Sequence, residues 1–80
     1  MQVNFTRHAL KRMGERRITD TEVLNTLQHP DAQSIRYDTL LALRQRKDGY
    51  WLVVVYTESD NIKKVITVII TSKIHKYLSL

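Results

Sequence analysis

Residues 47–71 have the sequence KDGYWLVVVYTESDNIKKVITVIIT, in which polar turns bound two runs of β-branched and aromatic residues. The Asp48-Gly49 pair is a strong hairpin signal. Trp51 to Thr57 is rich in valine and aromatic residues, which predicts a central strand buried on both faces. Ile62 to Thr71 follows a second polar turn and predicts the last long strand. Consecutive strands joined by short turns indicate an antiparallel meander.

Two further strands are predicted before this segment. Ala32 to Tyr37 is partly polar and fits an edge strand. Leu40 to Arg46 alternates in part, with leucines on one face and Arg44 and Arg46 on the other. Together with the two runs above, these strands predict a four-stranded antiparallel sheet.

The N-terminal third of the chain predicts two helices. Thr6 to Arg17 carries an apolar residue every four positions, which is typical of a helix with one buried stripe. Thr19-Asp20-Thr21-Glu22 has the spacing of a capping box, so a second helix is expected to begin there. His29-Pro30 ends that helix, because the residue before a proline is disfavoured in the α region. The expected fold is α+β, a single domain over residues 1–80 with two N-terminal helices packed on the four-stranded sheet.

The charge balance points to an anionic partner. Thirteen Lys and Arg residues oppose eight Asp and Glu residues, giving a formal charge of +5. Such a surface attracts phosphates and acidic proteins, although it also serves solubility. The chain has no cysteine, which excludes disulfides and thiolate zinc sites. The apolar runs are far shorter than the ~20 residues that span a bilayer, and residues 1–6 lack the apolar run of a signal peptide, so a cytoplasmic protein without membrane association is expected.

Three basic side chains recur along the first predicted helix. His8, Arg12 and Arg16 are spaced four residues apart and therefore lie on one side. The two arginines border the apolar stripe, where their planar guanidinium groups could hold a phosphate. The alternative is that the arginine stems lie along the edge of the core with the charged heads in water.

A second basic group lies in the C-terminal tail. Lys73, His75 and Tyr77 are residue types that can cleave RNA without a metal. In that reaction a base takes the proton of the 2′-OH, an acid protonates the leaving 5′-oxygen, and a cation stabilises the phosphorane. A solvated, frayed terminus is the alternative.

The third group consists of basic residues on the predicted strands, namely Arg36, Arg44, Arg46, Lys63 and Lys64. These residues could line a groove that follows a nucleic-acid backbone, with Tyr37 or Tyr50 as a stacking surface. Solubility or protection of a sheet edge explains them equally well. The three histidines are widely spaced and have no patterned carboxylate, so neither a metal nor a cofactor is expected.

The first-helix segment resembles a known family signature. Residues 5–18, FTRHALKRMGERRI, are similar to the H-A-x-x-R-M-x-x-R-G-I motif of a prokaryotic family catalogued as a domain of unknown function. Residues 21–23, the His29-Pro30 break and the strand at 65–69 extend the resemblance. The chain departs from the motif at Arg17, where glycine is usual. The resemblance implies a toxin of a toxin–antitoxin module, related to the RelE/ParE and barnase–EndoU–colicin groups, whose fold is N-terminal helices before a four-stranded antiparallel sheet.

The activity implied by this resemblance is that of a RelE-like mRNA interferase, a metal-independent endoribonuclease acting on free or ribosome-bound mRNA and neutralised by a small cognate antitoxin. The motif carries over His8 as acid or base, with Arg12 and Arg16 holding the phosphate. The supporting role of Lys73, His75 and Tyr77 rests on their chemistry and not on the motif. ParE-like relatives instead poison gyrase, so a non-catalytic toxin or nucleic-acid-binding module is the first alternative. The second alternative is an interaction subunit whose basic face binds an acidic protein.

Overall fold

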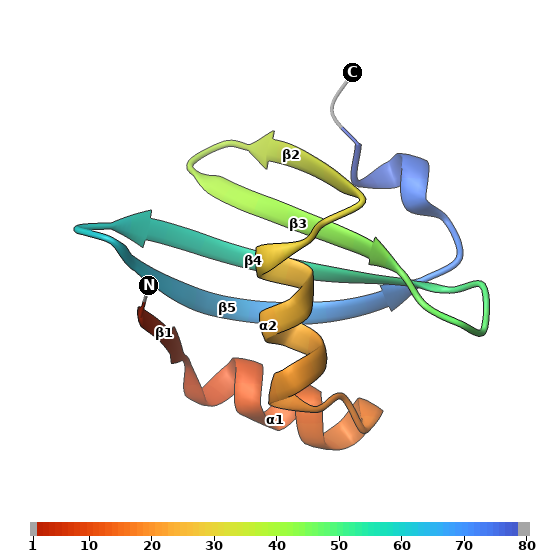
Figure 1. The fold of residues 1–80 in the computed structure, drawn as a ribbon, viewed down its shortest axis with the longest axis horizontal. Coiled ribbons are helices and arrows are strands. Elements are labelled where there is room, and N and C mark those ends of the chain that lie inside the picture. The colour runs from red at the N-terminus through yellow and green to blue at the C-terminus, as the bar shows by residue number, and fades with distance from the viewer. Residues whose placement is uncertain (1, 79–80) are drawn as a thin grey trace.

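The computed structural model describes residues 2–78 and contains a layer of helices against one mixed sheet (Figure 1). The elements in chain order are β1 (Gln2–Phe5), α1 (Arg7–Arg16), α2 (Asp20–Gln28), β2 (Ala32–Arg36), β3 (Thr39–Gln45), β4 (Trp51–Ser59), β5 (Ile62–Thr71) and the 3₁₀ turn η1 (Ile74–Lys76). The strand order in the sheet is β1-β5-β4-β3-β2. The helix-then-sheet layout of the predicted α+β fold is therefore present.

The predicted four-stranded antiparallel sheet is wrong, because the sheet has five strands and one parallel pair. The additional strand is β1, which pairs in parallel with β5 so that Gln2 lies opposite Ile62 and Phe5 opposite Val65. The backbone N–H of Thr6 continues the pairing by donating to the carbonyl of Val65 over 3.0 Å. A strand of four residues carries little periodicity of its own, and Phe5 fits the helical stripe as well as it fits a strand.

The meander formed by β2, β3, β4 and β5 is confirmed, with β4 in the middle of the sheet. The turn between β3 and β4 uses Gly49 at a φ of 87°. The turn between β4 and β5 places Asp60 and Asn61 at φ values of 53° and 65°. Aspartate and asparagine tolerate this left-handed region, which two-residue hairpin turns require.

Both helices begin as predicted. The Thr6 hydroxyl accepts from the N–H of Ala9 over 3.0 Å, and the Thr19 hydroxyl accepts from the N–H of Glu22 over 3.1 Å. The helix α1 is followed by Arg17, whose φ of 56° is in the left-handed region where glycine is favoured. The tight turn between the helices is therefore made without the glycine of the family motif.

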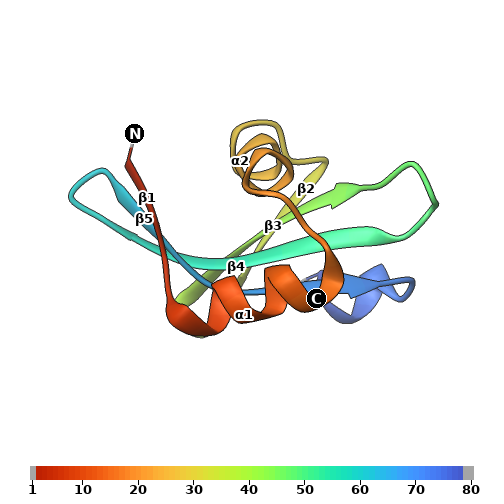
Figure 2. The same ribbon diagram turned by 90° about the horizontal axis from the view of Figure 1, so that it is seen from below.

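The sheet has two covered faces. The first, which we call the helix face, packs against α1 and α2 through residues that include Ala9, Met13, Val23, Leu27, Val54 and Val65. The second, the tail face, is centred on Leu41, Leu43 and Val53, and the C-terminal segment packs on it through Ile74, Tyr77 and Leu78. Figure 2 shows α2 and η1 on opposite sides of the sheet. The face opposite the helices is thus covered in part by the tail.

None of the helices described between residues 2 and 78 is long and apolar enough to cross a membrane.

Candidate functional site

The basic residues of the first helix lie on α1, which is anchored to the helix face by Ala9 and Met13. His8 and Arg16 are exposed on it. Arg12 forms an ion pair with Glu15, its Nη1 lying 2.8 Å from Oε1. None of the three cavities described among residues 2–78 is lined by His8, Arg12 or Arg16.

Arg44 on β3 and Arg46 just after it hold α2 against the sheet. Arg44 donates to the carbonyl oxygen of His29 over 2.7 Å, at the end of α2. Arg46 binds the carboxylate of Glu22 through its Nε over 2.8 Å, and its Nη1 lies 3.6 Å from Asp48. Glu22 therefore uses its side chain for Arg46, while only the hydroxyl half of the predicted capping box is seen. These two arginines have partners within the chain.

The lysines that begin β5 differ in their surroundings. Lys63 binds Glu58 over 3.0 Å and lies 5.1 Å from the centroid of the Tyr56 ring, so only 14% of its side chain is exposed. Lys64, the next residue, is exposed. The third predicted group thus does not form one groove, because its members lie on different faces and bind different partners.

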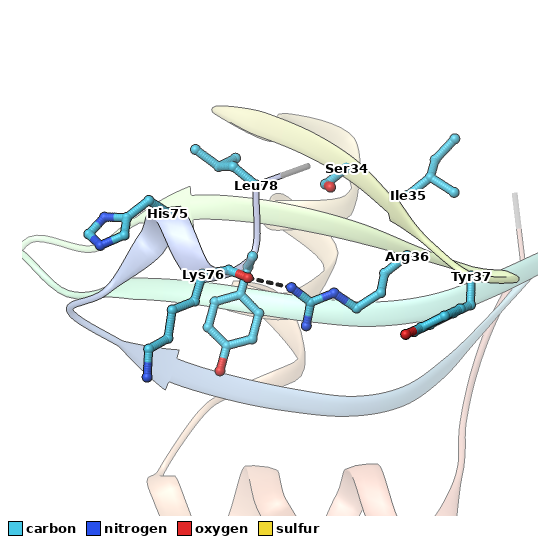
Figure 3. Close-up of a pocket in the computed structure, with 8 residues that line it drawn as sticks. Ser34, Ile35, Arg36, Tyr37, His75, Lys76 and Leu78 are labelled. Carbon is cyan, nitrogen blue, oxygen red and sulfur yellow. Dashed lines mark hydrogen bonds between the residues drawn. The ribbon is translucent and has the colours of Figure 1, made fainter. Parts of the chain in front are cut away.

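A cavity of about 790 Å³ lies between the edge strand β2 and the C-terminal segment (Figure 3). We call it the tail cavity; it is lined by Ser34, Ile35, Arg36, Tyr37, His75, Lys76, Tyr77 and Leu78. Alternation along β2 places Ser34 and Arg36 on the tail face, where the chain returns forty residues later. The tail cavity therefore joins two of the predicted groups, one from a strand and one from the tail.

Arg36 connects β2 to the C-terminal segment, the two sides of the tail cavity. Its Nη2 donates to the carbonyl oxygen of Lys76, and its guanidinium carbon lies 5.4 Å from the centroid of the Tyr77 ring. Figure 3 shows Arg36 pointing toward Lys76, whereas the imidazole of His75 points away from Arg36. Lys73 is exposed but does not line the cavity.

Lys76 is the basic lining residue of the tail cavity that is not among the candidates predicted from the sequence. It stands between His75 and Tyr77, but nothing in the sequence distinguishes its amino group from that of Lys73. The distinction arises because residues 74–76 form a 3₁₀ turn, which directs Lys76 to the cavity.

The tail cavity differs in charge from the other two cavities described in residues 2–78. Its lining carries Arg36, Lys76 and His75, and no carboxylate among the described residues. The second cavity contains Glu58 beside Lys63, and the third contains two carboxylates beside two basic residues. A cavity lined by cations without carboxylates favours an anion, and guanidinium groups suit phosphate oxygens.

Within residues 2–78, no group of three or more His, Cys, Asp or Glu side chains is arranged to hold a metal ion.

Comparison with protein-family models gives a match over residues 5–70 to a family described as Domain of unknown function (DUF4258). The chain belongs to this family. Neither the curated proteins nor the solved structures gave a match. The matched segment contains α1 and all of β2, and it ends before η1. The tail cavity therefore combines Arg36 from the family segment with His75 and Lys76 from beyond it.

Proposed function

We propose that this DUF4258 protein is a toxin-type endoribonuclease that binds RNA at the tail cavity. The observation that carries the proposal is the grouping of Arg36, Lys76 and His75 around one cavity without a carboxylate. The net charge of +5 favours association with a polyanion over the whole surface. The likeness of residues 5–18 to the family motif supports the assignment to a toxin–antitoxin module.

The proposed reaction is an attack by the ribose 2′-oxygen on the adjacent phosphorus. Arg36 and Lys76 hold the phosphate and stabilise the charge that develops on its oxygens. His75 takes the 2′-OH proton, because imidazole is suited to proton transfer near neutral pH. The 2′-oxygen–phosphorus bond forms as the phosphorus–5′-oxygen bond breaks, and the Lys76 ammonium protonates the leaving oxygen. The products are a 2′,3′-cyclic phosphate and a 5′-hydroxyl end.

A second candidate is an RNA-binding module that does not cleave its ligand. The orientation of His75 favours this candidate, because Figure 3 shows its ring turned away from Arg36. A proton acceptor must lie within hydrogen-bond reach of the 2′-OH, although catalytic contacts often tighten only when substrate binds. In this alternative Arg36 and Lys76 bind the backbone and no product forms.

RNA cleavage in excess EDTA distinguishes the two candidates. We expect wild-type protein to cut single-stranded RNA and His75→Ala to cut it about 100-fold or more slowly, which is the usual contribution of a general base. His8→Ala is the matched control, because His8 is also an exposed histidine but lies outside the tail cavity. An oligonucleotide with 2′-deoxyribose at every position should remain intact.

Three other outcomes have defined meanings. Loss of cleavage in His8→Ala but not in His75→Ala would place the site on α1 and refute the tail cavity. Salt-sensitive binding without product, weakened by Arg36→Gln, would select the non-catalytic module. Absence of both binding and cleavage by the wild-type protein would refute both candidates.

The toxin assignment has its own test. Induced expression of the chain should arrest bacterial growth, and co-expression of a small protein encoded beside it should restore growth. If wild-type protein arrests growth and His75→Ala arrests it equally, the toxicity does not depend on cleavage at the tail cavity.

A further inference from the structure

Tyr37 combines almost complete exposure to solvent with a strained backbone conformation. It forms the two-residue turn between β2 and β3 together with Asp38, and 95% of its surface is exposed. Its φ is 57°, in the left-handed region. An exposed large side chain at such a position gains almost no packing energy to offset the backbone conformation.

The choice of tyrosine stands out against the other two-residue turn of the same sheet. Between β4 and β5, the left-handed positions are occupied by Asp60 and Asn61, which tolerate positive φ. In type II′ hairpin turns, in which only the first central residue has a positive φ, glycine is favoured at that position for the same reason. Tyr37 therefore has almost no packing within residues 2–78 that would offset the strain of its backbone conformation.

The surroundings of Tyr37 indicate what it could bind. It follows Arg36 in the chain and lines the same tail cavity, and Figure 3 shows its ring at the end of the cavity farther from His75. A phosphate held by Arg36 places the neighbouring nucleotide within reach of this ring. Single-stranded nucleic acids are bound in this way elsewhere, by a cation on the backbone and an aromatic ring under the base.

We propose that Tyr37 is a base-stacking residue that selects single-stranded RNA at the tail cavity, an inference that rests on the RNA-binding function proposed above. Its ring packs on the face of the base next to the bound phosphate. Duplex RNA is excluded because its bases are already stacked and paired. Stacking on an aromatic ring tolerates any base, so Tyr37 selects strandedness more than sequence.

Tyr50 provides a matched comparison. It is also an exposed tyrosine, at 47%, and it lies beside the turn between β3 and β4. Tyr37 and Tyr50 are therefore at opposite ends of the seven-residue strand β3, roughly 20 Å apart at the rise of an extended strand. Tyr50 does not line the tail cavity, so it should not contact the base.

The test measures RNA affinity and stability on the same variants. The probe is a fluorescent single-stranded oligonucleotide with 2′-O-methyl groups, which cannot undergo attack by the 2′-oxygen. We expect Tyr37→Asn to weaken binding about fivefold to 100-fold, the range of a lost stacking contact. The same variant should raise the melting temperature by about 4 °C, because asparagine tolerates the left-handed backbone. Tyr37→Phe should keep the affinity, and Tyr50→Asn should leave it unchanged.

An oligonucleotide with abasic sites separates the base contact from the phosphate contact. The affinity of wild-type protein and Tyr37→Asn for this backbone-only probe should be equal. If Tyr37→Asn binds the intact probe as tightly as wild type while Arg36→Gln binds it weakly, the phosphate site stands and the stacking role of Tyr37 is refuted. If Tyr37→Asn loses affinity for the abasic probe as much as for the intact one, stacking is also refuted. If neither variant changes the affinity, the RNA function of the cavity fails as well.

Discussion

The arginines on the two faces of the sheet have different partners. On the helix face, Arg44 binds the carbonyl oxygen at the end of α2 and Arg46 binds Glu22 near its start. On the tail face, Arg36 donates to the backbone of Lys76 and borders a cavity with no carboxylate among its described lining residues. Arg46 is paired with carboxylates, and Arg44, like Arg36, donates to a backbone carbonyl oxygen. Of these three arginines, only Arg36 lines the tail cavity.

This difference shows that a row of arginines on neighbouring strands does not make a nucleic-acid groove. Alternation along a strand decides which face an arginine joins, and the element packed on that face decides what it binds. The helix α2 brings carboxylate and carbonyl oxygens to the helix face. The C-terminal segment brings Lys76 and His75 to the tail face and leaves the positive charge available to a ligand.

The largest effect that this comparison predicts is a loss of RNA affinity on removing the tail-face arginine. Arg36→Gln should weaken binding of single-stranded RNA about tenfold to 100-fold, because charge-assisted hydrogen bonds to a phosphate contribute about 1.5–3 kcal/mol. Arg36→Lys should lose less, since it keeps the charge but not the planar fork. Fluorescence anisotropy at fixed salt measures both, with circular dichroism to confirm that each variant is folded.

Arg44→Gln is the matched control for that measurement. It removes the same charge from the opposite face, so affinity for RNA should change by less than about twofold, the effect of one distant charge. Equal loss of affinity in Arg36→Gln and Arg44→Gln would mean that net charge alone holds the RNA, and the comparison between the faces would fail.

The second expected effect is a loss of stability on the helix face. Arg46→Gln should lower the free energy of unfolding by about 1–2 kcal/mol, because the Arg46–Glu22 pair is three-quarters buried on the arginine side and links α2 to the sheet. Urea denaturation measures this change. The double variant with Glu22→Gln should be less destabilised than the sum of the single variants, since the two residues share one interaction.

The exposed ion pair on α1 supplies the control for this second effect. Arg12→Gln removes the partner of Glu15, and both side chains are about 40% exposed. Such pairs contribute less than about 0.5 kcal/mol, so the urea midpoint should hardly change. A loss as large as that of Arg46→Gln would show that burial is not what makes the helix-face pair important.

The smallest expected effect is a gain in stability at the turn between the helices. Arg17→Gly should raise the free energy of unfolding by about 0.5–1 kcal/mol, because glycine has no Cβ to clash at a φ of 56°. RNA affinity should stay the same, since Arg17 does not line the tail cavity. A parallel fall in RNA affinity would show that cations of the helix layer also bind the ligand.

Much of the fold was predictable because its signals are local. The hydroxyls of Thr6 and Thr19 mark the helix starts, the His29-Pro30 pair marks a helix end, and the β-branched runs mark β4 and β5. The strand β1 was missed because its four residues become a strand only through pairing with β5, which follows it by about sixty residues. Parallel pairing over that separation leaves no signal in the short segment itself.

The candidate site was predicted in its residue types but not in its grouping. Arg36, His75 and Tyr77 were each identified, yet in separate groups, since only the return of the tail across the sheet brings them together. The spacing of His8, Arg12 and Arg16 correctly predicts one side of a helix, but spacing does not reveal a cavity. Arg44 binds His29 just after α2, and Arg46 binds Glu22 on α2. Contacts between separate elements of this kind cannot be obtained from periodicity.

The most direct test of the central claim is an NMR titration of the protein with the 2′-O-methyl single-stranded oligonucleotide. If RNA binds at the tail cavity, the backbone amide shifts should move most at residues 34–37 and 75–78. The amides around His8, Arg12 and Arg16 should move little at the same ligand concentration. Shifts concentrated along α1, with residues 34–37 and 75–78 unchanged, would contradict the account and return the site to the first helix.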